Sequence, residues 1–491
     1  MGMYVLQITQ VIYGFVFPKL VMANYGSSVN GLLSSITQFL SYIALMDAGV
    51  SAVIRSLLYR PLAFNDYSET QKIINSAQLF YRKIALFYLI YLGGVSIGLP
   101  LILAKEFNWI YTFSLVIIIG VSSFSEYYFG ISYITLLDAD QKKYIYCIIQ
   151  SISILFNLLI SVCLIKSGCS IHFVKFFSSA VYVIKPMIIA YYCKKKYRFH
   201  PQNNELEEIK NKWVGMANHI AYFLHTHIDI ILLTLFKGAK VVSVYSVYNV
   251  IVMGLVSLIS AATGGLEALF GNMNASHEGK QLEDSFYMSQ FFVFFISATI
   301  FSTAFLVIMP FVQIYTRGIS DANYYNEKLA ILMILAEFFY CIRLPYQSII
   351  VAVGKIKETM KGALIEVFIN IVLSLLLVHR FGMIGVVFGT LCGMIFRTLD
   401  YAVFLTRHYF HGNLAKLFRQ LIASFMAMIL AAVASRFLPQ YEISSYAIWV
   451  LMSIRAFFIS LFATLVLNCI FFREDVYKLR VAIVKKWNGF N

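Results

Sequence analysis

WVGMANHIAYFLHTHIDIILLTLF, residues 213–236, is long enough to cross a bilayer and yet carries ionisable side chains. About 20 apolar residues at ~1.5 Å rise per residue span the ~30 Å hydrocarbon core of a membrane. A carboxylate within it, here Asp229, costs roughly 3 kcal/mol to insert and therefore needs a polar partner or water. At ~100° per residue, four polar residues fall on one stripe of the helix: Asn218, Tyr222, His225 and Asp229. The stripe predicts either a helix that lines a transport path or an interhelical hydrogen-bond seam.

The composition of the whole chain agrees with a membrane environment. Hydrophobic residues make up 60% of the 491 residues and charged residues only 13%, with a mean hydropathy of +0.76. Because soluble domains are nearer a quarter charged, the chain is predicted to be a polytopic helical membrane protein. The seven cysteines are scattered through apolar runs without metal-ligand spacing, and we interpret them as small core residues.

Fourteen apolar runs are predicted to span the membrane: 3–23, 31–54, 83–104, 109–137, 144–166, 170–193, 213–236, 241–265, 288–315, 328–353, 361–379, 382–406, 416–437 and 446–472. The first run lacks a basic leader and a cleavage site, which favours a helix over a signal peptide. With the N-terminus in the cytoplasm, the inside loops hold 25 basic residues and the outside loops 8. Basic residues concentrate on the cytoplasmic side, so both termini are predicted to be cytoplasmic.

The longest basic loop divides the chain into two parts. It leaves six spans before it and eight after it. A short glycine turn at Gly26 opens the second span, and one at Gly238 opens the second span after the loop, as in a duplication. We predict an all-α membrane protein of two six-helix lobes around a central cavity, plus two C-terminal helices. The boundaries are 1–193 for the N-lobe, 194–212 for a cytoplasmic linker, 213–406 for the C-lobe, and 407–491 for the last two helices and a cytoplasmic tail.

Charged residues within the predicted spans indicate a hydrated cavity, because bare charges in lipid are costly. Cations there would attract an anionic head group, and arginine can bind phosphate with two nitrogens. Two of these charges, Arg397 and Asp400, are three apart on one helix and are expected to pair. Lys19 and Lys185 lie near span ends, from which a lysine can reach the interface. The candidate cavity residues are Lys19, Asp47, Lys175, Arg343, Arg397 and Arg455.

No enzymatic motif occurs in the sequence. It contains no glycine-rich phosphate loop, no HExxH and no GxSxG, so we predict a protein that is not an enzyme and does not itself use ATP. His225 and His227 are two residues apart, which places them on opposite faces of a helix and argues against a metal site. The net charge of +15 follows membrane topology rather than nucleic-acid binding. No cofactor is predicted.

Three segments resemble Wzx-type polysaccharide repeat-unit flippases, which belong to the multidrug/oligosaccharidyl-lipid/polysaccharide exporter superfamily. NYGSSVNGLLSSITQFLSYIALMDAGVSAVIRSLLYRPLA (24–63) resembles the region of their second helix. ISYITLLDADQKKYI (131–145) is similar to their turn between the fourth and fifth helices, and HIDIILLTLFKGAKVVSVYSVYNVI (227–251) to their seventh helix and the turn after it. The resemblance extends over the whole length through the number of spans and the long middle loop.

This resemblance implies a function and a location. The expected cargo is an undecaprenyl-diphosphate-linked oligosaccharide of O-antigen, capsule or exopolysaccharide synthesis, moved from the cytoplasmic to the outer leaflet. The protein would lie in the bacterial inner membrane and use an ion gradient for alternating access. Its partners would be that lipid-linked sugar, membrane lipid, and polymerase and chain-length proteins of the same pathway.

The related lipid II flippases also imply an ion site. Asp229 matches their helix-seven aspartate, Asn370 their helix-eleven asparagine and Thr390 their helix-twelve threonine. Ser374 stands where that family has a second carboxylate, which weakens the case for sodium. A proton carried by Asp229 with His225 is the other reading. Both H⁺ and Na⁺ stay open as the coupling ion.

Three other functions share some of these sequence features. A cation-coupled multidrug exporter of the same superfamily normally has twelve helices and takes cationic cargo, whereas this chain has fourteen spans and an excess of cations. A membrane-embedded polysaccharide polymerase or ligase needs a large outside loop, and the largest here is TRGISDANYYNEK (316–328). A non-transporting lipid-binding scaffold would have the same sequence features and stays open.

Overall fold

The apolar runs of the sequence form helices, and no strand occurs in the part of the chain that the structure describes. In this computed structural model that part comprises residues 2–47, 49–199, 216–276, 279–410, 414–437 and 445–477, with residues 216–226 described by their backbone alone. Thirteen helices of the described part are long and apolar enough to cross a membrane. The remaining predicted span, at 213–236, corresponds to one more long helix, α9 (Met216–Lys237). The predicted all-α membrane fold with fourteen spanning helices is therefore confirmed.

The helices group by their packing into two units, Met1–Ser246 with Ile319–Ala322, and Val247–Gly318 with Asn323–Asn491. Besides α9, the first unit contains α1 (Gly2–Tyr25), α2 (Ser27–Ser41), η1 (Tyr42–Met46), α3 (Val50–Ala63), α4 (Tyr67–Ile102), α5 (Trp109–Ser125), η2 (Glu126–Gly130), α6 (Ile131–Ala139), α7 (Lys143–Lys166) and α8 (Ile171–Lys196). The residues of α10 (Ala239–Thr263) up to Ser246 also belong to it. The predicted lobe boundaries, with a linker at 194–212, stay a prediction.

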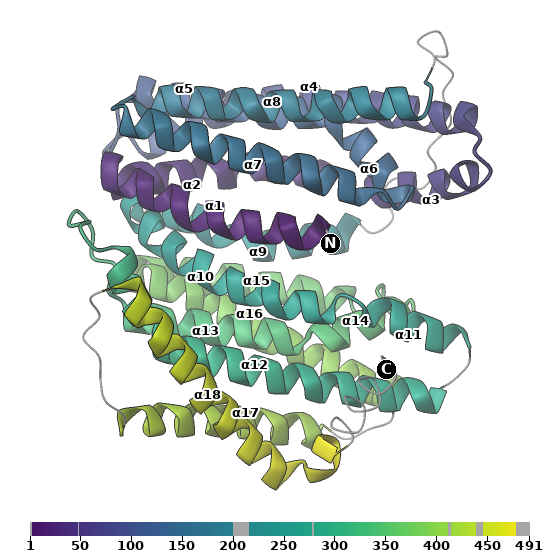
Figure 1. Ribbon diagram of the computed structural model, residues 1–491, viewed down its shortest axis with the longest axis vertical. Coiled ribbons are helices and arrows are strands. Elements are labelled where there is room, and N and C mark those ends of the chain that lie inside the picture. The colour runs from purple at the N-terminus through teal and green to yellow at the C-terminus, as the bar shows by residue number, and fades with distance from the viewer. Residues whose placement is uncertain are drawn as a thin grey trace. The chain divides into compact units, whose positions relative to one another are not determined.

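The second unit holds the rest of α10 and the helices that follow. These are α11 (Leu266–Ala275), α12 (Gly279–Tyr315), α13 (Glu327–Ile342), α14 (Leu344–Ala352), α15 (Met360–Phe381), α16 (Met383–His408), α17 (Ala415–Arg436) and α18 (Tyr446–Phe471). The last two helices pack on α12, and α18 runs obliquely across α17 (Figure 1). Trp449 of α18 fixes this packing, because its indole Nε1 donates to the carbonyl of Val307 at 3.1 Å and its ring contacts Phe311.

Three predicted spans are interrupted in the structure, and one of them, 328–353, is broken only at Arg343, between α13 and α14. The other two interruptions change the type of helix. The span predicted at 31–54 changes from α2 through the 3₁₀ turn η1 to α3, with Gly49 in a left-handed conformation at φ +85°. The span predicted at 109–137 contains the π-helical turn η2 between α5 and α6. Such turns leave backbone groups without regular helical partners, and they recur at functional positions of helices. Both interruptions lie beside half-buried carboxylates, Asp47 and Glu126.

Some helices extend well beyond a bilayer. α4 has 36 residues, which at ~1.5 Å per residue exceeds the ~30 Å hydrocarbon core. Its N-terminal end carries the polar cap Asp66, whose side chain accepts from the amide of Glu69 at 2.9 Å. The N-terminal end of α4 is therefore suited to lie in water, outside the hydrocarbon core. Large apolar side chains elsewhere stay exposed, such as Phe462 on α18 and Ile90 on α4, as expected of a surface that faces lipid.

Candidate functional site

Asp229 is held by a hydroxyl group from the helix that follows it. The turn at Gly238 reverses the chain between α9 and α10, so that Tyr245 comes opposite Asp229. The Tyr245 hydroxyl donates to Asp229 Oδ2 at 3.0 Å, and the aspartate is only 5% exposed. A buried carboxylate with a hydroxyl donor is equipped to bind a small cation or a proton.

The other members of the predicted polar stripe lie outside the described side chains. Asn218, Tyr222 and His225 belong to the part of α9 of which only the backbone is described. The pairing of His225 with Asp229 therefore stays a prediction. His227, which was predicted to point away from the stripe, is half-buried.

Three predicted ion ligands meet in the second unit. Ser374 on α15 donates from Oγ to Asn370 Oδ1 at 3.0 Å and to the carbonyl of Val386 at 3.1 Å. Thr390 on α16 donates to the same carbonyl at 3.3 Å. All three predicted ligands are buried. Together with the Val386 carbonyl they form a cluster of four hard oxygen atoms, the ligand type that Na⁺ shares with other hard cations.

A glycine makes this close approach of α15 and α16 possible. A Cβ atom at Gly389 would lie 2.4 Å from Ser374 Oγ and 2.9 Å from the Ser374 amide nitrogen, so no side chain fits there. Asn370, Ser374 and Thr390 thus lie together in the second unit, and Asp229 belongs to the first. Their joint role as ion ligands stays a prediction. Among the described residues, no group of three His, Cys, Asp or Glu side chains could hold a metal ion.

Arg343 and Arg397 are buried in a network of carboxylates. Glu366 lies between them, 2.6 Å from Arg343 Nη1 and 3.6 Å from Arg397 Nε. Both arginines are 4% exposed. Arg397 also donates to Asp400 at 2.7 Å, which confirms the pair predicted from their spacing. Two guanidinium groups and two carboxylates give a neutral cluster, which lowers the cost of burying each charge.

The two arginines differ in how many hydrogen bonds they already make. Arg397 gives Nη1 also to the carbonyl of Thr359 at 2.8 Å and Nη2 to the Tyr401 hydroxyl at 2.9 Å. Arg343 donates through Nη1 to Glu366 Oε1, and its buried Nε has no hydrogen-bond partner among the described residues. Binding of an anionic head group by these arginines stays a prediction, with Arg343 Nε the group that is still available.

The remaining predicted cavity residues are spread over several helices. Asp47, between η1 and α3, accepts hydrogen bonds from Tyr81 at 2.9 Å and Ser51 at 3.0 Å. Lys175 on α8 lies with Nζ 4.2 Å from the centre of the Phe17 ring, a cation–π contact. Lys19 on α1 and Arg455 on α18 are half-buried. That these residues line one common cavity stays a prediction.

The prediction that the Lys185 side chain reaches the membrane interface is wrong. Lys185 is 2% exposed, and its Nζ donates to both oxygens of Glu126 at 3.1 Å. Glu126 opens the π-helical turn η2, and a Cβ at Gly130 at the end of this turn would come within 2.8 Å of Pro186 Cβ. Sequence spacing offers no signal for this pair, because its members are 59 residues apart on different helices.

A second charge cluster lies at the helix ends predicted to face the cytoplasm. Asp138 forms ion pairs with Arg55 and with Lys143, the latter at 3.2 Å. Next to it, Asp140 accepts from Lys142 and from the Tyr197 hydroxyl, both at 2.5 Å. Burial and the hydrogen bond to the Asp140 carboxylate raise the pKa of Tyr197. The segment quoted for its resemblance, 131–145, thus ties the ends of α3, α6, α7 and α8 together.

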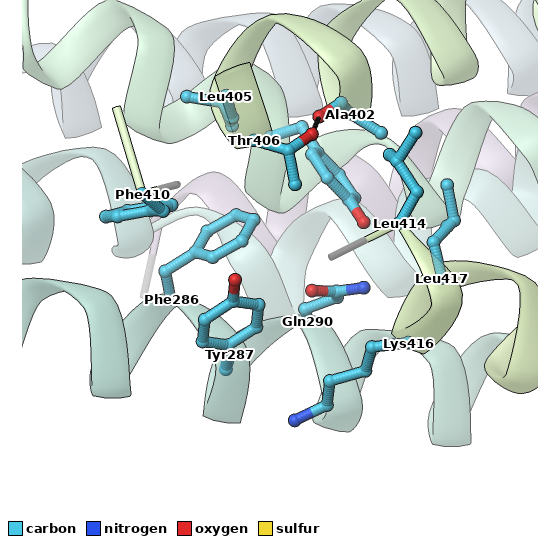
Figure 2. A pocket seen from close by; sticks show the side chains of 11 residues that line it. Phe286, Tyr287, Gln290, Ala402, Leu405, Thr406, Phe410, Leu414, Lys416 and Leu417 are labelled. Atoms are coloured by element: carbon cyan, nitrogen blue, oxygen red, sulfur yellow. Dashed lines mark hydrogen bonds between the residues drawn. The ribbon is translucent and has the colours of Figure 1, made fainter. Parts of the chain in front are cut away.

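A small pocket lies in the second unit, and none of the predicted site residues lines it (Figure 2). It is lined by aromatic rings, among them Phe286, Tyr287 and Phe410, together with Gln290 and Lys416. Gln290 donates to Gln420 Oε1 at 2.7 Å, and its own buried Oε1 has no described partner. The cavity volume of about 20 Å³ is close to what one water needs, so the pocket suits a bridging water rather than cargo.

The chain is similar to known proteins both in part of its sequence and in its fold. The MatE family model matches residues 216–376. No sequence among the curated proteins matches the chain. Among solved structures, the chain is similar to the lipid II flippase MurJ in an inward closed conformation, with a TM-score of 0.71, 14% identity, and 97% of this chain and 98% of that chain covered.

Multidrug transporters share the same fold over a shorter stretch. The chain is similar to the MATE multidrug transporter DinF-BH, with a TM-score of 0.61, 16% identity, and 83% of this chain and 93% of that chain covered. It is also similar to a MOP superfamily transporter from Pyrococcus furiosus, with a TM-score of 0.57, 13% identity, and 82% and 94% covered. At these identities the likeness establishes the fold alone, which the chain shares with these flippases and transporters.

Proposed function

We propose that this chain is a flippase that moves undecaprenyl-diphosphate-linked oligosaccharide repeat units from the cytoplasmic to the outer leaflet of the bacterial inner membrane. The observation that carries the proposal is the likeness to MurJ over 97% of the chain. That coverage leaves too few residues to omit α17 and α18. The MATE structure DinF-BH covers 83%, and the remainder is comparable in size to the segment 407–491. A lipid-linked cargo is favoured because the last two helices accompany it in MurJ.

The buried arginines support an anionic cargo. A diphosphate entering a low-dielectric cavity needs positive partners, and arginine offers planar, paired donors for it. Arg343 has an unused buried Nε, and Lys175 carries its charge against an aromatic ring rather than a carboxylate. Both are candidates to contact the head group when the cargo is bound.

The oxygen cluster supports ion coupling. In the second unit, Asn370, Ser374 and Thr390 offer neutral oxygens to a cation. In the first unit, Asp229 carries a buried charge that Na⁺ or H⁺ would balance. Binding of the ion to the carboxylate removes a buried net charge, and this differential affinity is what can shift a conformational equilibrium. Polymerase and chain-length proteins that use the delivered sugar lipid stay proposed partners.

A multidrug exporter is the second candidate, favoured by one observation. The MatE model matches 216–376, which includes Asp229 and part of the oxygen cluster. An exporter of this fold would use the same ion site and differ in cargo.

The test is a flipping assay in proteoliposomes that contain this chain and a fluorescent undecaprenyl-diphosphate oligosaccharide. Dithionite added outside quenches only outer-leaflet lipid, so flipping appears as loss of the protected fraction. We expect flipping to accelerate at least tenfold under an imposed Na⁺ or H⁺ gradient. Unchanged flipping together with gradient-driven uptake of a cationic dye would replace the flippase by the exporter.

A further inference from the structure

Two helices of the first unit begin without a capping side chain of their own. α2 begins after Gly26 and α10 after Gly238, and both glycines have left-handed φ values, +89° and +83°. The helices α5, α8, α13 and α18 begin at the same predicted outer face and carry polar N-caps: Asn108, Ser170, Asn326 and Ser445. The first amides of a helix need acceptors, so those of α2 and α10 must find them elsewhere.

A carboxylate far along the chain caps α2. Asp321 lies between α12 and α13, in the short segment that groups with the first unit. Its Oδ2 accepts from the backbone amide of Ser27 at 2.7 Å, and its Oδ1 accepts from the Ser27 hydroxyl at 2.6 Å. The capped residue is fully buried. A bidentate, charge-assisted contact of this length is among the stronger hydrogen bonds in proteins.

A second carboxylate caps α10 in the same manner. Glu106, between α4 and α5, accepts from the amide of Ala239 through Oε1 at 2.9 Å. The contact is possible only at a glycine, because a Cβ on Gly238 would lie 1.9 Å from that oxygen. A negative charge at a helix N-terminus also interacts favourably with the helix dipole.

The two caps form a reciprocal exchange. Glu106 belongs to the first half of the sequence and caps a helix of the second half, whereas Asp321 belongs to the second half and caps a helix of the first. Both carboxylates sit in corresponding loops, each preceding the fourth spanning helix of its half. Both capped helices are the second of their half and begin at the glycine turns that relate the two halves in sequence.

Between the two caps, the backbones of α2 and α10 touch. A Cβ on Gly31 would lie 1.7 Å from the Ala239 carbonyl oxygen, so the helices meet there without a side chain between them. One turn away, Asn30 Nδ2 donates to Ser243 Oγ at 2.9 Å, with both residues buried. Each cap thus lies beside a tight helix crossing.

We propose that Glu106 and Asp321 form an outer latch, which ties α10 to the loop before α5 and α2 to the loop before α13. The latch keeps the outer ends of α2 and α10 joined at their crossing and releases when the transport path opens to the outside. The latch rests on the proposed transport function in one respect, that these ends must part during each cycle. Parting them removes both carboxylates from the helix ends and exposes the first amides to water, which can replace the carboxylate oxygens. The latch is therefore reversible, and it favours the state in which the outer ends are joined.

The experiment measures access to the crossing rather than transport. Ser243→Cys is introduced into a chain whose native cysteines are replaced by serine, and a membrane-impermeant maleimide is added from outside. We expect slow labelling in the otherwise unchanged protein. Glu106→Ala or Asp321→Ala should raise the labelling rate about tenfold, and both together about a hundredfold, because each removes a charge-assisted cap that stabilises the joined state.

Two controls accompany these variants. Glu327→Ala removes a carboxylate that follows the same loop but accepts from the Tyr325 hydroxyl instead of a helix end, and it should leave the labelling rate unchanged. Lys105→Cys, in the exposed loop next to Glu106, should be labelled quickly in every background. Failure to label Lys105→Cys from outside would overturn the outer position of the latch. Equal labelling of Ser243→Cys with and without the two carboxylates would overturn the latch itself.

A variant locked by a disulfide tests the latch even if the alanine variants fail to fold. In the same cysteine-free background, Ser27→Cys with Asp321→Cys is oxidised to a disulfide that replaces the cap by a covalent bond. Cargo movement should fall at least tenfold in the oxidised protein and return on reduction. Full transport by the oxidised protein would show that the ends never part. Loss of all transport by the reduced protein as well, with normal maleimide results, would count against the proposed cargo and not against the latch.

Discussion

At the scale of single residues, the chemistry gathers where a charged group and its donor come from neighbouring helices. Asp229 and Tyr245 meet across the Gly238 turn, and Glu366 joins two arginines of different helices. Each carboxylate is buried and satisfied by groups that a conformational change can remove. Their substitution therefore distinguishes a coupling role from a purely structural one.

Asp229→Asn should leave the protein inserted and abolish gradient-driven transport, since the amide carries no charge for the ion to balance. Tyr245→Phe removes one hydrogen bond to the carboxylate, worth about 1.5–3 kcal/mol, and should slow transport about tenfold or more. Flipping in proteoliposomes checks both. Asp284→Asn, at an exposed position on α12, is the matched control and should transport normally. Normal transport by Asp229→Asn would exclude a coupling role.

Glu366→Gln should destabilise the second unit, because Arg343 and Arg397 would be left as buried charges with too few carboxylates. Removing one partner of a buried pair costs about 3–5 kcal/mol. Thermal unfolding in detergent measures the loss. Glu358→Gln breaks the exposed pair with Lys355 and should leave the unfolding temperature nearly unchanged, because water screens this pair. Adding Arg343→Met to Glu366→Gln should recover part of the stability, and its failure to do so would contradict the pairing.

Sequence reasoning identified many of these residues without their partners. Arg397 and Asp400 were paired correctly because a spacing of three on a helix places side chains on one face. Glu366 with Arg343, and Lys185 with Glu126, pair across helices, which no local spacing encodes. The same limit explains why Lys185 was predicted to reach the interface, since its neighbouring proline and position pointed to a helix end.

At the scale of helices, glycines decide how closely two elements approach. Gly31 lies against the Ala239 carbonyl and Gly389 against Ser374, whereas Gly93 on α4 has open space around it. Small residues permit such backbone contacts between membrane helices, which replace the hydrophobic effect as a source of packing energy. The same residue type therefore has opposite consequences at different positions.

Gly31→Ala should disrupt the crossing of α2 and α10, since the new methyl group would overlap the Ala239 backbone. Overpacking of this kind costs about 1–3 kcal/mol or more, measured as a lower unfolding temperature in detergent. Gly93→Ala should be neutral or stabilise by up to about 1 kcal/mol, because alanine is the better helix former. Equal effects of the two substitutions would argue that the helices do not touch at Gly31.

The outer latch should be insensitive to pH in the physiological range. Burial alone would raise the pKa of Asp321, but hydrogen bonds from Ser27 and the charge of Lys240 hold it below its usual value of 3.8. A lowered pKa means that the stabilisation is complete above pH 3.8 and is lost as the pH falls further. In the Glu106→Ala background, the labelling rate of Ser243→Cys divided by that of Lys105→Cys should stay constant from about pH 8 to 5, since the division cancels the loss of reactive thiolate at low pH. A rise within that range would contradict the assignment.

Most helix ends followed the apolar runs, but α4 and α12 begin well before theirs, and the interruptions inside the runs were not predicted. Gly49 and the π-helical turn at Glu126 break runs whose hydropathy is continuous. Hydropathy averaged over a window of residues does not detect a single left-handed glycine or one extra residue in a helical turn. Tertiary contacts, such as Tyr81 with Asp47, accompany these breaks and are absent from the sequence pattern.

At the scale of the whole molecule, the coupling ion decides what drives the cycle. If Na⁺ binds the oxygen cluster, it should raise the unfolding temperature of the purified protein. Na⁺ at one hundred times its dissociation constant stabilises by about 2.7 kcal/mol. Asn370→Ala should remove this effect, whereas K⁺ at equal ionic strength should not reproduce it. Identical unfolding temperatures in Na⁺ and K⁺ would leave H⁺ as the coupling ion.

The overall architecture was the part most open to prediction. The low cost of apolar residues in lipid and the high cost of bare backbone groups leave few alternatives to a bundle of spanning helices. Fourteen helices and the glycine turns followed from that constraint. The grouping of Ile319–Ala322 with the first unit did not, because it depends on one aspartate reaching across 294 residues of sequence.

That distance has a consequence for how the chain is made. α2 is synthesised and inserted early, but the acceptor for its first amide is translated only when residue 321 emerges. Until then, water must satisfy the amide at the membrane surface. The cap of α10 has the opposite order, because Glu106 precedes the helix that it serves. The N-terminal end of α2 thus stays uncapped during synthesis. The folding of the protein is complete only after most of the second half has been inserted into the membrane.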